Sequence, residues 1–85
     1  MNASDFYAMQ AKALVKDLRE RRGLPYKELA RRLEAEGETV DVQVLINRVN
    51  KGKYSFGFAL QLLAAMDAQS IPVPKNPGAA PRKRT

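Results

Sequence analysis

The stretch from residue 23 to residue 53 reads GLPYKELARRLEAEGETVDVQVLINRVNKGK and decides the fold, because it encodes two consecutive amphipathic helices. Pro25 suits the first turn of a helix, where its missing N–H costs no hydrogen bond. Apolar residues then recur on one face at helical spacing, at Tyr26, Leu29, Ala30 and Leu33. The first helix of this stretch is therefore predicted to run from Pro25 to about Glu36–Gly37.

The second helix of this stretch is predicted from about Val40 or Asp41 to Lys51. Thr39 is the expected N-cap, and Gly52 is the expected left-handed residue after the last turn. The inward face is predicted to consist of Val42, Leu45, Ile46 and Val49. Residues 34–39 link the two helices and hold three glutamates and a glycine. These residues are expected either to extend the helix that starts at Pro25 by a turn or to form a wing-like loop.

A further helix is predicted before this pair, from about Asp5 to Arg22. Ser4 is its expected N-cap, and Asp5 is favourable in the first turn because the N-terminal end of a helix attracts negative charge. The apolar stripe of this helix is predicted at Tyr7, Ala11, Leu14 and Leu18.

A last helix is predicted after the pair, over about residues 56–68 and capped by Ser55. It is apolar on two opposite sides, so it is expected either to be central to the fold or to be covered by another chain. One side consists of Phe58, Leu62 and Ala65. This side is expected to form a homodimer interface, unless the helix predicted over residues 5–22 or residues 71–73 cover it. The expected fold is all-α, a compact helix-turn-helix domain of four to five helices over residues 1–70.

Residues 71–85 differ in character from the rest of the chain. Four prolines and the Arg-Lys-Arg end cannot build a core, so this segment is expected to be a disordered basic tail. The net charge of the chain is +6, but residues 1–70 carry 11 basic and 9 acidic side chains, a net charge of only +2. Composition alone therefore gives weak support for a polyanionic partner.

Composition also disfavours several classes of protein. The 85 residues include neither cysteine nor histidine, which excludes disulfides and thiolate metal sites and removes the commonest general base. The acidic residues do not follow the spacing of a calcium or magnesium loop, and no two candidate catalytic groups fall at a convincing spacing. No apolar run approaches the roughly 20 residues of a membrane span, and no signal segment is recognised at the N-terminus. The sequence predicts a cytoplasmic protein that is not an enzyme and uses no cofactor, metal or membrane.

The central pair of helices resembles a known superfamily. Residues 28–30, Glu-Leu-Ala, and residues 46–53, Ile-Asn-Arg-Val-Asn-Lys-Gly-Lys, look like the helix-turn-helix domains of the phage lambda repressor and Cro superfamily. The similarity covers about residues 10–68, and the pattern that includes residues 52–56 also resembles a family of small bacterial helix-turn-helix domains of unassigned function. The resemblance implies a bacterial or phage DNA-binding domain that reads the major groove with its third helix, which is the one predicted here over about residues 40–51. The link at residues 34–39 is longer than its counterpart in the superfamily.

The outer face of the third helix carries side chains suited to reading base edges. Amides can pair with an adenine edge, valines can contact thymine methyl groups, and lysines suit phosphates or guanine. The expected base-reading residues are Gln43, Val44, Asn47, Asn50 and Lys51. Val40 and Val44 are both expected on this face, and two exposed valines indicate contact with DNA or with protein. The alternative is an ordinary solvated helix face.

Phosphate contacts are expected from basic residues around this face and from the tail. The expected set is Lys27, Arg31, Arg48, Lys53, Arg82, Lys83 and Arg84. The helix predicted over residues 5–22 carries a basic stripe of Lys12, Lys16 and Arg19. This stripe either follows a phosphate backbone or is a solvated face.

These patterns favour a sequence-specific transcriptional regulator, a repressor that binds double-stranded DNA as a dimer and is associated with the nucleoid. The alternative is a protein-interaction adaptor on the same fold, which docks onto a polymerase or another regulator. That alternative is motivated by the low net charge of residues 1–70, the glutamates of the link and the exposed valines. General nucleic-acid coating is disfavoured because no aromatic stacking platform is evident.

Overall fold

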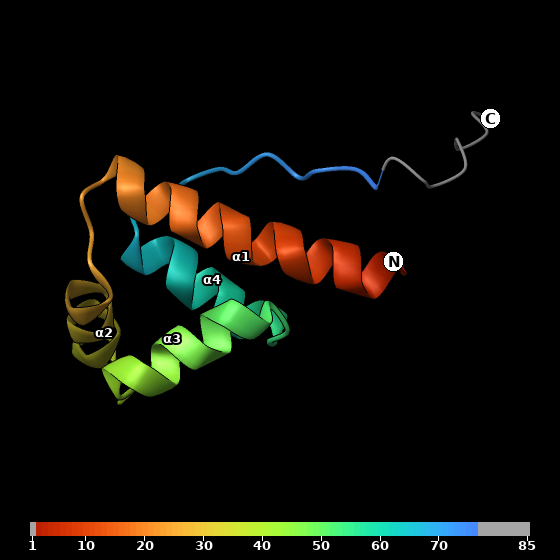
Figure 1. Ribbon diagram of the computed structural model, residues 1–85. Coiled ribbons are helices and arrows are strands. Elements are labelled where there is room, and N and C mark those ends of the chain that lie inside the picture. Colours follow the sequence, from red (N-terminus) through yellow and green to blue (C-terminus); the bar gives the residue numbers. More distant parts are fainter. Residues whose placement is uncertain (1, 77–85) are drawn as a thin grey trace.

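The structure, a computed structural model, describes residues 2–76, which form four helices and no strand. The helices are α1 (Ala3–Arg21), α2 (Tyr26–Ala35), α3 (Val42–Lys51) and α4 (Phe56–Ala65). α1 packs against α3, and α2 packs against both α3 and α4. In Figure 1 the N-terminal end of α1 extends beyond the other three helices. The predicted all-α, four-helix fold is confirmed, and no helix among the described residues is long and apolar enough to cross a membrane.

The starts of α1 and α3 differ from the prediction. α1 starts after Asn2, whose Oδ1 accepts a hydrogen bond from the N–H three residues on (2.8 Å), so Ser4 lies inside the helix. α3 starts after Asp41, whose Oδ2 accepts from the N–H groups two and three residues on (3.0 and 3.3 Å). Asp is a better N-cap than Thr, which explains why Asp41 replaces Thr39 in this role. The predicted cap of α4, Ser55, is confirmed (3.0 Å).

The ends of α1 and α4 share one hydrogen-bonded motif. At α1 the N–H of Leu24 donates to the carbonyl of Arg19 (2.8 Å) across Gly23, whose φ is +56°. This is the Schellman arrangement, which satisfies last-turn carbonyls and here turns Leu24 into the core. α4 ends in the same way at Asp67, which is the one non-glycine residue with a positive φ (+58°) among those described.

The link between α2 and α3 is anchored to the domain. Of the two expectations for residues 34–39, the structure supports an extension of α2, because Glu34 and Ala35 are helical. The chain then turns at Gly37 (φ +97°) and runs to Asp41. Val40, predicted on the outer face of the third helix, instead packs against the core, because the helix begins two residues later.

The core is built from all four helices and the turn after α1. Its fully buried side chains are Leu29, Leu33, Leu45, Val49, Leu62 and Met66. α1 contributes Val15 and Leu18 to this core. Tyr7, predicted in the apolar stripe of the first helix, is largely exposed, because the first turns of α1 extend past the helices that would cover them.

The predicted homodimer interface is wrong. Phe58, Leu62 and Ala65 are at most 4% exposed and belong to the core of this single chain. The sequence of α4 is apolar on both sides, so its pattern does not reveal which side faces inward. The exposed side carries Phe56 and Leu60 instead.

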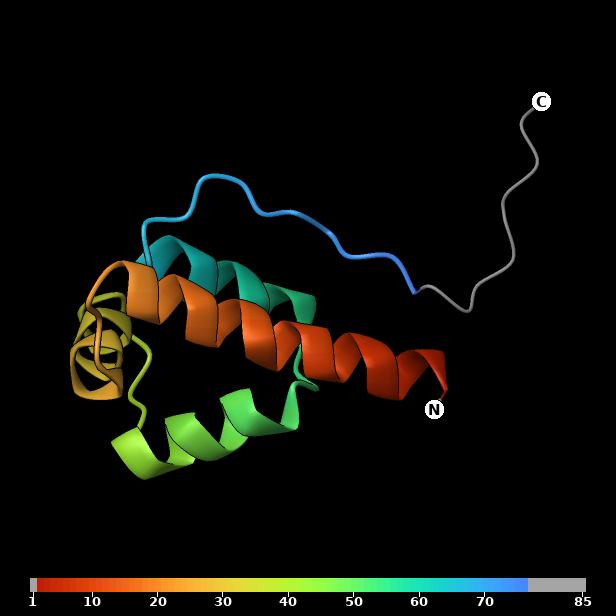
Figure 2. The same ribbon diagram turned by 45° about the horizontal axis from the view of Figure 1, so that its top comes forward.

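The segment after α4 runs back beside α1 toward its N-terminal end (Figures 1 and 2). Ile71 packs against the core, and the N–H of Asn76 donates to the Tyr7 hydroxyl (3.4 Å). Residues 71–76 of the predicted disordered tail are thus placed against the domain. The remainder of that tail, with Arg82, Lys83 and Arg84, lies outside the described residues.

Candidate nucleic-acid interface

α3 presents one polar face to solvent because its opposite face is fixed in the core. Leu45 and Val49 are completely buried, and Val42 and Ile46 are half-buried beside them. The side chains on the other side are all exposed, and they are the five predicted base-reading residues, Gln43, Val44, Asn47, Asn50 and Lys51. We call these five residues the α3 face. The structure brings them together on one surface, while base reading itself stays a prediction.

Two amides of the α3 face hold each other in position. The Nε2 of Gln43 donates a hydrogen bond to the Oδ1 of Asn47 across one helical turn (3.2 Å). This bond leaves the Gln43 amide with its oxygen and one N–H available. An acceptor and a donor side by side on one amide are what the N6 and N7 edge of adenine requires. Asn47 therefore orients Gln43 for such a contact.

One acidic side chain, that of Asp41, lies just before α3. Asp41 is exposed and caps α3, so its negative charge lies at the helix N-terminus, where it is stabilised by the first-turn N–H groups. No acidic residue follows it within α3.

Val44 is the one half-exposed valine of this helix.

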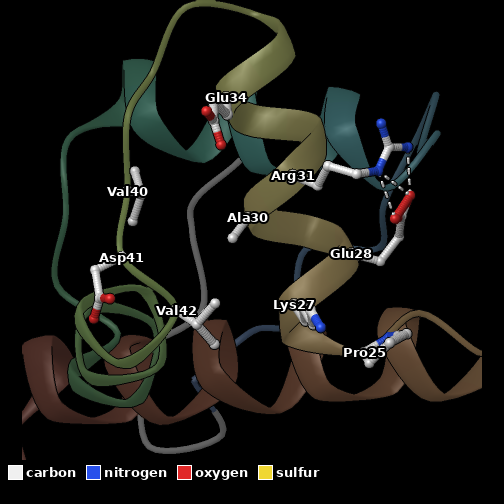
Figure 3. Close-up of a pocket in the computed structure, with 9 residues that line it drawn as sticks. All are labelled: Pro25, Lys27, Glu28, Ala30, Arg31, Glu34, Val40, Asp41 and Val42. Carbon is white, nitrogen blue, oxygen red and sulfur yellow. Dashed lines mark hydrogen bonds and ion pairs between the residues drawn. The ribbon is translucent and has the colours of Figure 1, made fainter.

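Lys27 lies in the first turn of α2 and is exposed. The N-cap of α2 is Pro25, which offers no side-chain hydrogen bond to the first-turn N–H groups. Lys27 and Val42 line the same shallow groove of about 480 Å³ between α2 and the start of α3 (Figure 3). Lys27 is therefore a cation near the N-terminal end of α3, in a groove that Glu28, Glu34 and Asp41 also line.

Arg31 is placed less favourably for phosphate than the sequence suggests. Its Nε lies 2.8 and 2.9 Å from the two carboxylate oxygens of Glu28, as Figure 3 shows. The Arg31 hydrogen bond lowers the pKa of Glu28, and the Glu28 carboxylate raises the pKa of Arg31. The charge of Arg31 is thus compensated within α2, which weakens its expected role as a phosphate contact.

Two other predicted phosphate residues also have partners within the domain. The guanidinium of Arg48 lies over the ring of Phe58, 3.6 Å from its centroid, so α3 and α4 are joined by a cation–π contact. The Nζ of Lys53 lies 3.6 Å from a carboxylate oxygen of Asp5 in α1, and both side chains are largely exposed. Exposed pairs of this kind are weak and exchange readily with another anion.

Sequence reasoning did not identify the cluster of lysines at the C-terminal end of α3. Lys12 of α1 lines a cavity of about 330 Å³ together with Asn50, Lys51 and Lys53. The sequence grouped Lys12 with Lys16 and Arg19 along one helix, but the structure separates them. Arg19 lies over the Tyr26 ring (3.7 Å from its centroid), whereas Lys12 lines a cavity with residues at the end of α3 that are distant in sequence. Only the packing of α1 on α3 brings this cluster together.

No group of three or more acidic side chains that could hold a metal ion lies together in residues 2–76.

The groove of Figure 3 has an apolar floor of Ala30, Val40 and Val42, and Glu34 and Asp41 lie at its edge.

Taken together, fold and surface define a small all-α domain with an exposed, amide-rich helix flanked by lysines. The chain belongs to the family described as a domain of unknown function, DUF6471, which matches residues 7–71. No curated protein and no solved structure matches the sequence of this chain.

Proposed function

We propose that this protein is a sequence-specific DNA-binding transcriptional regulator that places α3 in the major groove, in the manner of the helix-turn-helix proteins it resembles. The observation that carries the proposal is the α3 face: three amides, one valine and one lysine on one side of a helix whose other side is locked in the core. Binding DNA would associate the protein with the nucleoid.

Gln43 is the proposed reader of an adenine, and Asn47 is the residue that positions its amide. The 3.2 Å hydrogen bond between them favours one orientation of the Gln43 side chain in the free protein. A pre-oriented side chain loses less conformational entropy on binding, so it discriminates better between base pairs. Val44, on the adjacent part of the face, is suited to a thymine methyl group.

Lysines at the two ends of α3 support the same placement. Lys27 lies beside the N-terminal end of α3, and Lys12 lies with Lys51 at the C-terminal end. A helix of this length spans about 15 Å, and the major groove is about 12 Å wide. Cations at both ends of a helix seated in the groove therefore lie near the phosphates of both strands.

Selection from a randomised duplex library at near-physiological salt tests this function. We expect enrichment of a short palindrome, because one ten-residue helix covers few base pairs and two copies bound to half-sites double the contacts. Asn47→Ala is expected to weaken binding to the selected duplex and to reduce discrimination at one base pair. The matched control is Gln69→Ala, which removes an exposed amide outside α3. Full binding by the Gln43→Ala, Asn47→Ala, Lys51→Ala variant would exclude this reading face.

A protein-interaction adaptor is the second candidate, and the groove of Figure 3 favours it. Its floor is apolar and its edge carries Glu34 and Asp41, which repel phosphates but accept basic or amide groups of a polypeptide. In that case the selection yields weak binding that disappears with added salt and no enriched sequence. A charge-reversing change at Glu34 then weakens binding to the protein partner.

A further inference from the structure

The outward side of α4 is an exposed apolar surface. Phe56 is 79% exposed and Leu60 is 52% exposed, and the two residues are one helical turn apart. Gly57 and Ala64 are exposed on the same side, and no residue of α4 is charged. We call these four residues the α4 face. Single exposed apolar residues are ordinary, but a contiguous uncharged side of a helix indicates a contact with another surface.

Gly57 keeps the backbone of the α4 face uncovered. A Cβ built at Gly57 would meet only the Ser55 Oγ, at 3.9 Å, so the fold of the single chain has room for a side chain there. Its backbone is also in the ordinary helical region, unlike that of Gly52. Gly57 is the second residue of α4, where glycine costs less relative to alanine than it does in a helix interior. Its missing side chain leaves the backbone at this exposed position open to close approach by another surface.

We infer that the α4 face binds the α4 face of a second copy of this chain, about a two-fold axis. A two-fold interface uses the same surface patch on both copies. A charged residue near the axis would therefore lie opposite a charge of the same sign on the partner. The α4 face has no charge and avoids that repulsion, whereas the rest of the described surface is rich in charged side chains. This lack of charge fits self-association better than docking onto a charged partner.

The size of the surface places the dimer among weak, reversible complexes. A phenylalanine buries about 150–250 Å², and the α4 face adds one leucine and two small residues. Two such faces fall at the low end of specific interfaces, below about 1,200 Å² in total. We therefore expect a reversible dimer that forms at high protein concentration and dissociates on dilution, consistent with a core that is complete in one chain.

The inference builds on the proposed function in one respect, since pairing of two copies supplies the second reading helix. It uses different residues, because none of the α4 face belongs to the α3 face. Its test uses the free protein without DNA, so its failure and the failure of the proposed function are separate results.

Sedimentation equilibrium over a range of protein concentrations tests the inference. We expect the wild type to show a reversible monomer–dimer equilibrium and Leu60→Glu to weaken dimerisation by at least tenfold. The matched control is Met9→Glu, which places the same charge at a residue of α1 that is 54% exposed, and it is expected to dimerise like the wild type. Circular dichroism checks that both variants remain folded.

Gly57→Ala and Phe56→Ala keep the inference testable if Leu60→Glu disturbs the fold. Gly57→Ala is expected to raise the unfolding midpoint at concentrations where the protein is monomeric and to weaken the dimer, two effects of opposite sign. Phe56→Ala is expected to weaken the dimer without lowering the stability of the monomer. A wild type that stays monomeric at all concentrations, or a dimer that survives both alanine changes, would overturn the inference.

Discussion

Replacing Gly52 with alanine is expected to destabilise the domain strongly, for two reasons that the structure separates. Gly52 has a φ of +65°, a left-handed conformation that costs a residue with a side chain about 1–2 kcal/mol. A Cβ at this position would also overlap the backbone carbonyl of Ala8, because the end of α3 lies directly against α1. Relief of that overlap requires α1 to move, and overpacking of this kind costs a further ~1–3 kcal/mol.

The expected loss for Gly52→Ala is therefore about 2–5 kcal/mol, a large part of the total stability of a domain of this size. Gly23→Ala is the matched control, because Gly23 has a similar φ of +56° but nothing within 4 Å of its added Cβ. It should lose only the conformational part, about 1–2 kcal/mol. Urea denaturation followed by circular dichroism measures both values. Equal losses in the two variants would refute the argument that close contact with α1 requires a glycine at residue 52.

Three further predictions concern charged side chains. Asp41→Asn retains an N-cap but removes a negative charge beside the α3 face, so duplex affinity measured by fluorescence anisotropy should rise, most clearly at low salt; unchanged affinity would place Asp41 away from DNA. The hydrogen bond from Arg31 lowers the pKa of Glu28 below its ordinary value in the folded protein, so this pair contributes stability at neutral pH that is lost as the pH falls through the folded-state pKa. Glu28→Gln should therefore make thermal stability decline less between neutral and acidic pH, and an identical decline in both proteins would contradict this. Arg32→Met removes a hydrogen bond to a last-turn carbonyl of α4 (2.8 Å) and should cost about 1–2 kcal/mol in urea denaturation, while the exposed control Arg22→Met should cost little.

The helical spacing of apolar residues predicted that the described chain forms four helices, while the exact starts of α1 and α3 differ from the prediction. Gly52 was correctly predicted to be left-handed, and Ser55 was correctly predicted to cap α4. The error at Val40 follows from the choice of cap, since a helix that begins after Asp41 leaves Val40 in the link, where it packs inward. A shift of two residues at a helix start thus changes which side chains lie on its outer face.

The error at α4 and the unpredicted lysine cluster at the end of α3 have a different cause, because tertiary contacts decide both. Both sides of α4 are apolar, and only its packing on α2 shows that Leu62 is buried while Leu60 is exposed. The pairing of Arg31 with Glu28 follows ordinary helical spacing and could have been predicted from the sequence. The cavity that Lys12 and Lys51 both line could not be predicted, since it depends on how α1 packs on α3.

The contact between Arg48 and Phe58 makes the ring a natural spectroscopic probe. The guanidinium belongs to the helix proposed to enter DNA, whereas the ring belongs to the core, and the two lie 3.6 Å apart. A phosphate that draws Arg48 away from the ring would change the local magnetic environment of Phe58 without any added label. Because the Tyr54 ring packs edge-to-face with the Phe58 ring (5.5 Å between centroids), the aromatic NMR signals of Tyr54 should respond as well. Ligand binding at the surface of α3 is thereby reported by resonances from the interior of the domain.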